Sequence, residues 1–416
     1  MSKIIRMRYS GSVMPVVSCC LCKSSNLELI IDLGMHPLAD TFLKKEQLFL
    51  PETRYPLQVL LCKACGHAMS SYVVPAHTRY QENDYSYDSS NSKVSITHFD
   101  EMAKDISAKV AVTNSDLVVD IGGNVGTLLS AFRTHTGAKI LNIEPSPNIS
   151  ALAVKNDVET IQDFFNDEAA QEIKKRGGAK VILATNVFNH IDGLDEFMKN
   201  ITNALTPDGA FVFETPYLLH LLEKIAFDTI YLEHVSYFAI KPLSQYFKKF
   251  GLTITEIVEN DYMGGSMRVT ARLGSAAEAE TVAQCMRKEE SAKLYDPATY
   301  EVMMKKVADF KFSLLHQLTQ ARMAGGKVIG IGAATKGNTL LNYCGIDSTM
   351  LAFVTDASPL KVNKYTPGSR IPILPDEAIT SDVTHALILP WNIATFLKEK
   401  LAPKYPHIVF ITPHME

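Results

Sequence analysis

The sequence lacks a long apolar run, a strong excess of either charge, and any low-complexity tract or short-period repeat. Its 41 Lys and Arg residues against 45 Asp and Glu give a formal net charge of −4. This balance leaves no excess of basic residues to bind a phosphate backbone, which argues against DNA or RNA as the partner. No stretch approaches the roughly 20 apolar residues that span a bilayer, and the first residues show no secretory pattern. We expect a cytoplasmic protein, not associated with membranes, that acts on small molecules.

Cysteine is also scarce, with seven residues in the chain, but four of them form two Cys-x-x-Cys pairs near its start. Zn²⁺ prefers four soft or borderline ligands in a tetrahedron, so two such pairs close a structural site with no open position for chemistry. In a chain of this size the pairs favour metal ligation over a disulfide framework, and the alternative is a set of buried free thiols. The predicted zinc ligands are Cys19, Cys22, Cys62 and Cys65.

Short apolar segments divide the chain into three expected domains. From residue 117 to about 274, apolar strands such as LVVDIGG, KILNIEP and VILATNV alternate with helical segments, which is typical of a parallel sheet flanked by helices. Residues 276–323 contain no glycine and one proline, so they predict two helices, and the strand–helix alternation restarts after them. We therefore expect an α/β protein with a zinc-binding module at 1–85, a central Rossmann-like domain at 86–275, and a helical arm with a second Rossmann-like domain at 276–416.

A glycine-rich turn, DIGGNVG at residues 120–126, follows the first strand of the central domain and opens a helix. Its glycines let the backbone approach a ligand closely, and the helix N-terminus presents free N–H groups. The same turn also occurs as a plain connection in doubly wound proteins. Glu144 ends the next strand, at a position where a carboxylate accepts hydrogen bonds from ribose hydroxyls. Together the two features predict a nucleoside cofactor.

Two histidine-bearing segments follow, NVFNH ending at His190 and YLEHVSYF containing His234. A histidine beside a glutamate is a competent general base, because the carboxylate orients the ring and stabilises the imidazolium. Adjacent side chains point in different directions, so Glu233 is free to serve another group while His190 or Tyr231 orients His234. The alternative is that YLEH is an ordinary loop or helix start.

A second glycine turn, GIGAATKGN at residues 330–338, lies between a strand and a helix of the C-terminal domain. Its backbone N–H groups, with Thr335 and Lys336, are suited to hold a diphosphate. Asp356 at the end of the next strand keeps an NAD site open as the local alternative. Three further cations are candidates for phosphate or base contacts, with solvated loop charges as the alternative: Lys361, Lys364 and Arg370.

The motifs occur in an order that is characteristic of one family. The zinc module contains DLGxxPLA and is followed by YSYxSS, NVFNHI, YxEH and FETPYL, and the C-terminal part contains GxGAATKGNTLLN and TPGSRIPI. The DxGxxxG turn with IEPS resembles motifs I and II of class I S-adenosylmethionine-dependent methyltransferases. Over nearly its whole length the chain resembles the zinc-containing sugar C-methyltransferases of deoxysugar pathways, such as the D-tetronitrose pathway.

The resemblance implies that the central domain binds S-adenosylmethionine. Asp163 and Phe164 fall where that fold pairs an acidic group and an aromatic ring with adenine, and Asn186 ends the fourth strand beside the sulfonium. Val125 stands where relatives often carry an acidic residue. The implied cofactor contacts are Asp120, Gly122, Asn124, Gly126, Glu144, Asp163, Phe164 and Asn186.

The resemblance also implies an NDP-4-keto-6-deoxysugar substrate that is methylated at C-3 after removal of the acidic proton beside the ketone. The zinc module would help close the sugar site, and the C-terminal domain would hold the nucleotide. His234 matches the family's proposed base, and its neighbours around the sugar match Tyr85, His190, Tyr231 and Glu233. The expected nucleotide contacts are Thr335, Lys336, Asn338, Asp356, Lys361, Lys364 and Arg370.

Two other classes of function stay open at this point. A zinc-ribbon RNA methyltransferase would need a basic face that the charge balance does not predict. A non-catalytic protein that binds a nucleotide sugar or S-adenosylmethionine is suggested by Val125 in the cofactor turn. The sequence leaves the nucleotide, the sugar substituents and methylation at C-3 or C-5 undecided, and we expect a monomer or a small homo-oligomer.

Overall fold

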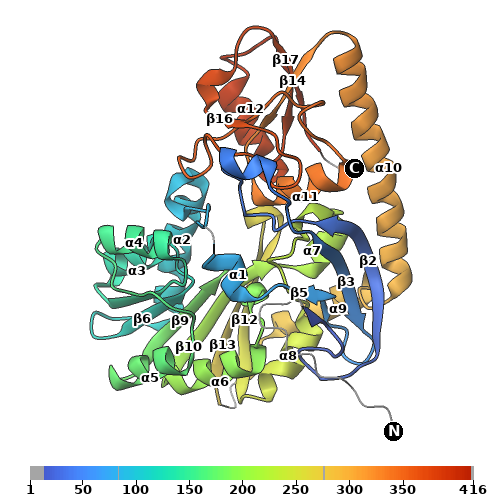
Figure 1. The fold of residues 1–416 in the computed structure, drawn as a ribbon. Helices are drawn as coiled ribbons and strands as arrows, with labels where there is room; N and C mark the ends of the chain where they lie inside the picture. The colour runs from blue at the N-terminus through green and yellow to red at the C-terminus, as the bar shows by residue number, and fades with distance from the viewer. Residues whose placement is uncertain (1–13, 83, 275–276, 414–416) are drawn as a thin grey trace.

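The computed structural model describes residues 14–82, 84–274 and 277–413 of the chain. Three units follow one another: an N-terminal antiparallel sheet, a central α/β unit below it in the view of Figure 1, and a C-terminal α/β unit above it. One continuous hydrophobic cluster includes Leu57 of the first unit, Phe213 of the second and Leu341 of the third. The three units therefore share a core. Within the described ranges no helix combines the length and apolarity needed to cross a bilayer.

The N-terminal unit is built on a four-stranded antiparallel sheet that recruits a strand from the central unit. Its order is β11-β4-β3-β2, and Ser236 and Tyr237 of β11 pair with Met69 and Ala68 of β4. The sheet thus extends beyond the expected boundary at residue 85. Its strands are β2 (Leu27–His36), β3 (Tyr55–Cys62), β4 (Ala68–Ser70) and β11 (Ser236–Tyr237), with a separate pair β1 (Met14–Pro15) and β5 (Tyr72–Val73) and the short helices η1 (Lys45–Phe49) and α1 (Ala76–Tyr80).

Helix α2 (Lys93–Val110) leads into the central unit after the short turn η2 (Ser89–Asn91). The amphipathic pattern of residues 95–112 predicts this helix. In the structure the helix begins and ends two residues earlier than the pattern predicts. Ser92 caps the start, since its hydroxyl accepts a hydrogen bond from the amide of Ser95. Ala111 takes a left-handed conformation with φ 55° and ends the helix.

The central unit contains a seven-stranded sheet of order β12-β13-β10-β9-β6-β7-β8. The five strands from β8 to β10 are parallel, as the alternating pattern predicts, whereas β12 and β13 form an antiparallel hairpin at the edge because only five residues separate them. The strands are β6 (Leu117–Ile121), β7 (Lys139–Ile143), β8 (Thr160–Ile161), β9 (Ala179–Thr185), β10 (Leu205–Pro216), β12 (Leu252–Asn260) and β13 (Ser266–Leu273).

Helices connect these strands, and the order in which the strands are added to the sheet reverses at β6. From β6 the sheet continues to β7 on one side and to β9 on the other, and ligands of open α/β sheets bind in the crevice at such a switch point. The connecting helices and turns are α3 (Thr127–Thr136), α4 (Pro147–Lys155), α5 (Asp167–Lys175), η3 (Phe188–His190), α6 (Leu194–Ala204), α7 (Leu218–Glu223), η4 (Phe227–Thr229), α8 (Ile240–Lys248) and η5 (Tyr262–Gly264).

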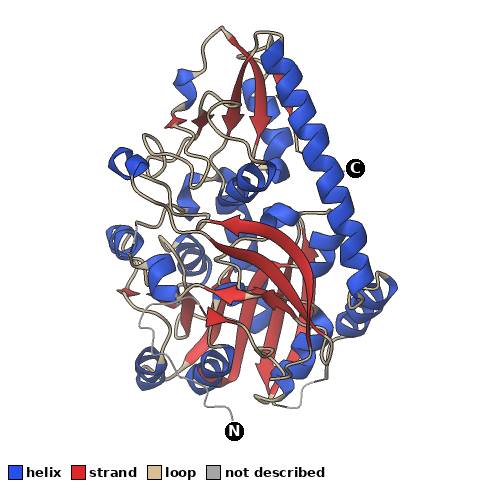
Figure 2. Ribbon diagram, turned by 45° about the vertical axis from the view of Figure 1, so that its right-hand side comes forward, coloured by secondary structure: helices blue, strands red, loops and turns tan. Residues whose placement is uncertain are grey.

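The two predicted helices of the arm are α9 (Glu280–Ser291) and α10 (Pro297–Met323), and α10 runs along one side of the molecule up to the C-terminal unit (Figures 1 and 2). That unit contains an all-parallel sheet of order β16-β15-β14-β17-β18. Its elements are β14 (Lys327–Ile331), α11 (Thr335–Cys344), β15 (Val354–Thr355), β16 (Ile373–Leu374), η6 (Asp376–Ala378), β17 (Val383–Ile388), η7 (Trp391–Ile393), α12 (Ala394–Leu401) and β18 (Val409–Ile411). The second Rossmann-like unit is thereby confirmed.

Candidate active site

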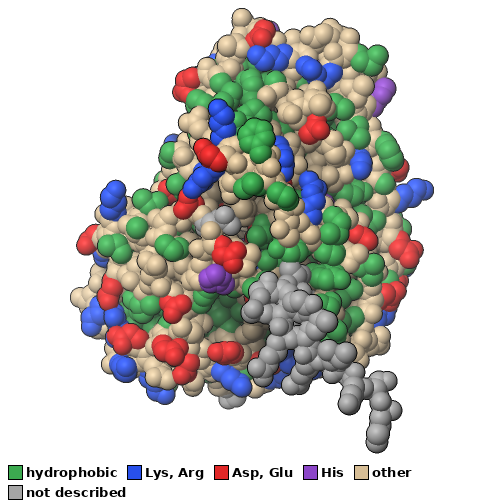
Figure 3. Space-filling view, in the orientation of Figure 1, with side chains coloured by type: hydrophobic (Ala, Val, Ile, Leu, Met, Phe, Trp, Pro, Cys, Tyr) green, Lys and Arg blue, Asp and Glu red, His purple; other side chains and the backbone are tan. Residues whose placement is uncertain are grey.

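A cavity of about 1450 Å³ lies where the three units meet, and all three contribute to its lining. The central unit supplies the glycine turn and the two histidine segments, the N-terminal unit supplies Asp40 and Tyr80, and the C-terminal unit supplies the turn at Thr335. On the outer face shown in Figure 3, acidic and basic side chains are interspersed. A concave site of this size, lined by apolar and polar side chains from several elements, is typical of a ligand-binding site.

The glycine turn closes over the end of β6, as its sequence predicts. Gly122 has φ 62°, and a Cβ atom there would come within 2.6 Å of Val187, so the position requires glycine. Asp120, Gly122 and Asn124 line the cavity. Gly126 is the residue before α3 and packs on Val158 outside the lining. Helix α3 begins directly after this turn, and the first N–H groups of an α-helix have no partner within the helix.

Two buried carboxyl groups stand beside the turn. Glu144 accepts hydrogen bonds from the amides of Ser146 (2.8 Å) and Asn124 (3.2 Å), and burial raises the pKa of its carboxyl. Burial, with the nearby Glu144, raises the pKa of Asp120 to about 8. Among the described residues, Asp120 Oδ1 has no hydrogen-bond partner. Both groups line the cavity and are suited to accept hydrogen bonds from a ribose.

Of the three residues predicted around the adenine and the sulfonium, two line the cavity and one does not. Phe164 and Asn186 line the cavity, and Asn186 follows β9 with φ 54°. Asp163 is exposed and lies outside the lining, and its carboxylate accepts hydrogen bonds from the amide of Phe164 and the side chain of Asn166. An adenine contact by Asp163 stays a prediction.

His234 faces the cavity from the YLEH segment and is buried, with 4% of its surface exposed. Its Nδ1 lies 2.8 Å from the carbonyl oxygen of Thr229. A carbonyl only accepts hydrogen bonds, so Nδ1 carries the proton and Nε2 keeps a free lone pair. Burial lowers the pKa of His234 to about 3, which keeps the ring neutral. The ring of Tyr231 lies 3.8 Å from it, centroid to centroid.

His190 and Glu233 surround this imidazole. The rings of His190 and His234 are 4.8 Å apart, and Nδ1 of His190 lies 2.6 Å from the hydroxyl of Tyr80. Glu233 Oε1 accepts a hydrogen bond from the amide of Asp40 at 2.9 Å, whereas Oε2 is buried and has no partner among the described residues. Burial raises the pKa of Glu233 to about 7. Near neutral pH this carboxyl can therefore hold a proton and donate it to a ligand.

Tyr85 reaches the same cavity from the loop before α2. Its ring lies 5.6 Å from that of Tyr80, and its amide and carbonyl both bind the side chain of Asn148. Burial raises the pKa of the Tyr85 hydroxyl well above its ordinary value, so the group stays a hydrogen-bond donor. The predicted set of Tyr85, His190, Tyr231, Glu233 and His234 therefore lines one cavity.

Sequence reasoning missed the residues that hold this set together. Arg79 on α1 is buried and donates hydrogen bonds to the carbonyl oxygens of His190 (3.1 Å) and Glu233 (3.2 Å), and it pairs with Asp192. Its partners are 111 and 154 residues away, so no local pattern indicates them. Tyr80 and Asp40 were missed for the same reason. His98 was missed too; it lines the cavity and binds Glu214 at 2.6 Å.

Four of the predicted nucleotide contacts line the cavity: Thr335, Lys336, Asp356 and Lys361. The ammonium of Lys336 is buried and lies 4.3 Å from the centre of the Trp391 ring, without a hydrogen-bond partner among the described residues. Burial lowers the pKa of Lys336 to about 8. Asp356 accepts hydrogen bonds from the amides of Ala333 (2.7 Å) and Ser358 (2.8 Å) and so stabilises the second glycine turn.

Three other predicted contacts lie outside this lining. Asn338 donates a hydrogen bond to the carbonyl oxygen of Ala39. Arg370 donates to the carbonyl oxygens of Leu48 and Leu50. Both side chains therefore tie the C-terminal unit to the N-terminal one. Lys364 lies in a separate small pocket, and a substrate role for these three residues stays a prediction.

The four paired cysteines converge, as their spacing predicts. The sulfur atoms of Cys19, Cys22, Cys62 and Cys65 all lie within 4.8 Å of one another, with Cys19–Cys65 at 3.7 Å and Cys22–Cys62 at 3.5 Å. A tetrahedral ion with Zn–S bonds of about 2.3 Å requires sulfur separations of about 3.8 Å. The four thiols fit Zn²⁺ and leave no position for a substrate.

Three family models match consecutive parts of the chain: a zinc binding domain at residues 19–80, a methyltransferase domain at 99–257, and a C-methyltransferase C-terminal domain at 261–410. The chain resembles the C-methyltransferase NovU of Streptomyces niveus with 32% identity over 388 residues, which cover 92% of this chain and 91% of NovU. A ubiquinone biosynthesis O-methyltransferase of Rhodopseudomonas palustris is 28% identical over 99 residues, or 24% of this chain and 39% of that protein.

Among solved structures, an S-adenosylmethionine-dependent methyltransferase from Clostridium acetobutylicum covers 43% of this chain and 92% of its own, with 12% identity and a TM-score of 0.35. The cofactor turn and the matched domains define an S-adenosylmethionine-dependent methyltransferase with a zinc module. The chain belongs to the family of zinc-containing C-methyltransferases that includes NovU. The family expected from the motifs is thereby confirmed.

Proposed function

We propose that this enzyme methylates an NDP-4-keto-6-deoxysugar at C-3, with His234 as the base, in the biosynthesis of branched-chain deoxysugars. The observation that supports it most is the buried imidazole of His234, whose Nε2 lone pair faces a cavity shared by a cofactor turn and a second nucleotide-type turn. A C-methyltransferase must create a carbon nucleophile, and a neutral base beside its substrate provides one.

The proposed first step is proton removal. The 4-keto group acidifies the hydrogen on C-3, Nε2 of His234 takes that proton, and the C–H electron pair becomes the enolate between C-3 and C-4. The imidazolium that forms is stabilised by the carbonyl of Thr229 on Nδ1–H and by the ring of Tyr231, 3.8 Å away. Because burial lowers the pKa of His234, its ring is neutral before each turnover, and Nε2 is available to accept the proton.

The enolate oxygen then needs a hydrogen-bond donor. Glu233 in its protonated form is suited to this, since its Oε2 has no partner among the described residues. Tyr85 and the Tyr80–His190 pair offer further donors in the same cavity. Glu144 and the glycine turn would hold S-adenosylmethionine, which would supply the electrophilic methyl group for the enolate carbon.

The nucleotide of the substrate is proposed to lie at the second glycine turn. The ammonium of Lys336 lacks a hydrogen-bond partner among the described residues, and a diphosphate would supply the missing acceptors. The turn at the start of α11 adds backbone N–H groups, although Thr335 is already engaged with Asp40. The cytoplasmic location and the monomeric or small oligomeric state expected from the sequence stay predictions.

The test is incubation of the zinc-loaded enzyme with S-adenosylmethionine and a panel of NDP-4-ketosugars that differ in nucleotide and ring substituents. We expect a new methyl group on C-3, located by NMR. Without S-adenosylmethionine, the C-3 hydrogen should exchange with deuterated solvent, because His234 acts before methyl transfer. A product methylated on oxygen, or at a carbon not adjacent to the ketone, would refute the proposed reaction.

A further inference from the structure

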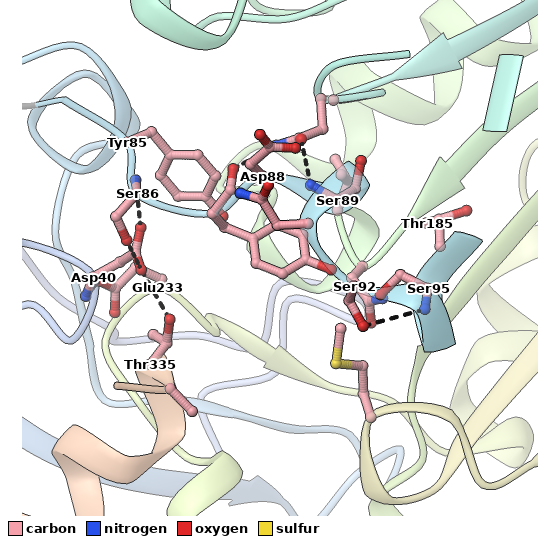
Figure 4. Close-up of a pocket in the computed structure, with 18 of the residues that line it drawn as sticks. Asp40, Tyr85, Ser86, Asp88, Ser89, Ser92, Ser95, Thr185, Glu233 and Thr335 are labelled. Carbon is pink, nitrogen blue, oxygen red and sulfur yellow. Dashed lines mark hydrogen bonds between the residues drawn. The ribbon is translucent and has the colours of Figure 1, made fainter. Parts of the chain in front are cut away.

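Asp40 connects all three units at the edge of the cavity. It lies after β2 in the N-terminal unit, and only 7% of its surface is exposed. Its carboxylate accepts hydrogen bonds from the hydroxyl (2.8 Å) and the amide (3.2 Å) of Ser86 and from the hydroxyl of Thr335 (2.8 Å), and its amide donates to Glu233 Oε1 at 2.9 Å (Figure 4). These partners are 46, 295 and 193 residues away in sequence.

The contact with Thr335 changes the interpretation of that residue. A threonine hydroxyl has one proton to donate, and Thr335 donates it to Asp40. The same hydroxyl cannot simultaneously donate to a phosphate oxygen. Asn338, one turn further along α11, donates to the carbonyl oxygen of Ala39 at 2.7 Å. Because residues three apart lie on one face of a helix, this face of α11 docks on the Ala39–Asp40 segment.

The contact with Ser86 fixes the neighbouring Tyr85. Asp40 holds Ser86 by both its amide and its hydroxyl, and the side chain of Asn148 holds the amide and carbonyl of Tyr85. The main chain is thus fixed on both sides of the Tyr85 side chain, which lines the cavity. Asp40 therefore contacts the two segments from which the proposed enolate donors Tyr85 and Glu233 extend.

We propose that Asp40 is a positioning residue for methyl transfer: it sets the orientations of Glu233 and Tyr85 and makes both depend on the docking of α11 at the nucleotide end of the cavity. This inference rests on the proposed function for the roles of Glu233 and Tyr85. The geometry that carries it is independent of any ligand. Asp40 itself takes part in no chemical step of the reaction.

Asp40 also acts on the protonation of Glu233. Burial is the main cause of the raised pKa of Glu233; the amide of Asp40 lowers that pKa, and its carboxylate raises it. The other charged or titratable groups around Glu233 are Arg79, Tyr80, Tyr231 and Tyr237, together with the imidazoles of His190 and His234, whose pKa values burial lowers. Replacing Asp40 by Asn keeps the main-chain amide and the shape of the side chain but removes its charge and one of its two acceptor oxygens. The pKa of Glu233 should therefore fall in Asp40→Asn.

The first test needs no substrate. Full-length, zinc-loaded protein carrying ¹³C-carboxyl-labelled glutamate is titrated by NMR, and the Glu233 resonance is assigned with Glu233→Gln. In Asp40→Asn we expect its midpoint to fall by about half a pH unit or more. Ser86→Ala removes a hydrogen bond but keeps the charge, so its midpoint should match the wild type. An Asp40→Asn midpoint equal to the wild-type value overturns the inference.

The second test uses turnover of the keto sugar and decides the question if Asp40→Asn does not fold. Thr335→Val should lower kcat about tenfold with unchanged affinity for S-adenosylhomocysteine, and Thr335→Ser, which keeps the hydroxyl, should restore it. A rise of KM for the sugar nucleotide at unchanged kcat would instead assign Thr335 to the phosphate and overturn the inference. Wild-type enzyme that methylates no keto sugar would refute the proposed function, while the NMR titration would still decide the role of Asp40.

Discussion

The hydroxyl of Ser70 donates a hydrogen bond to the main-chain carbonyl of His234 at 2.8 Å. The amide of Ser70 also donates to the carbonyl of Val235 at 3.0 Å, and the next residue pairs with β4 as part of β11. Strand β4 begins three residues after Cys65, the last of the four paired cysteines. The cysteine knuckle thus sets the position of the strand on which the proposed base rests.

Removal of the metal should therefore reduce activity although no cysteine touches the cavity. We expect chelation of zinc, or Cys62→Ser, to loosen β4 and to lower kcat by at least tenfold, because β4 fixes the backbone at His234. Activity is measured alongside hydrogen exchange of the β4 and β11 amides. Cys344→Ser, which removes a buried thiol of the C-terminal unit outside the cluster, is the matched control. Full activity in metal-free protein would contradict this coupling.

Replacement of the proposed base should abolish chemistry while binding persists. We expect His234→Asn to lower kcat by about 10³-fold, the usual contribution of a general base. Affinity for S-adenosylhomocysteine should change less than twofold, because Glu144 and the glycine turn are untouched. The exposed His77→Asn serves as the control. Near-normal solvent exchange at C-3 in His234→Asn would remove this histidine from the mechanism.

The parts of the site predictable from sequence are those encoded by short motifs. The cysteine pairs, the glycine turn and YLEH each bring their residues together within a few positions, and the structure places them on one cluster or one cavity. The parallel strands follow from continuous apolar runs, since such strands are buried on both faces. The two-residue strand β11 has no such signal, because its pairing with β4 depends on a segment far away in the chain.

Long-range polar contacts account for the rest. Arg79 and Asp40 are single polar residues in an ordinary sequence context, and their partners are more than 100 residues away in most cases. Only the folded structure shows that each of these two residues is hydrogen-bonded to at least two separate segments of the site. Arg370 shows the same limit: the sequence cannot reveal that its guanidinium donates to main-chain carbonyls of the N-terminal unit, and its predicted substrate contact stays a prediction.

The buried Glu233 should make stability fall with rising pH. Burial raises the pKa of its carboxyl from 4.5 to about 7. Between these values the folded protein binds more protons than the unfolded chain, so this group lowers the free energy of unfolding as the pH rises from about 4.5 through about 7. Glu233→Gln should flatten that slope and recover up to about 3 kcal/mol at pH 8. Urea unfolding across this range measures it, with the exposed Glu46→Gln as control. An unchanged slope would show that Glu233 titrates alike in both states.

Lys336 should be the main cationic contact of the nucleotide. Its ammonium lies 4.3 Å from the Trp391 ring centre, and the indole N–H of Trp391 donates to Asp228 at 2.8 Å, so the cation is held in place without a hydrogen-bond partner of its own among the described residues. A charge-assisted hydrogen bond contributes about 1.5–3 kcal/mol, so Lys336→Met should weaken nucleoside diphosphate binding by about 10- to 150-fold in calorimetry. Lys404→Met, an exposed lysine outside the cavity lining, should bind as the wild type does. The loss in Lys336→Met should be smaller for the nucleoside alone, because that ligand lacks the phosphates. An equal loss for nucleoside and nucleoside diphosphate would assign Lys336 to packing against Trp391 and not to phosphate recognition.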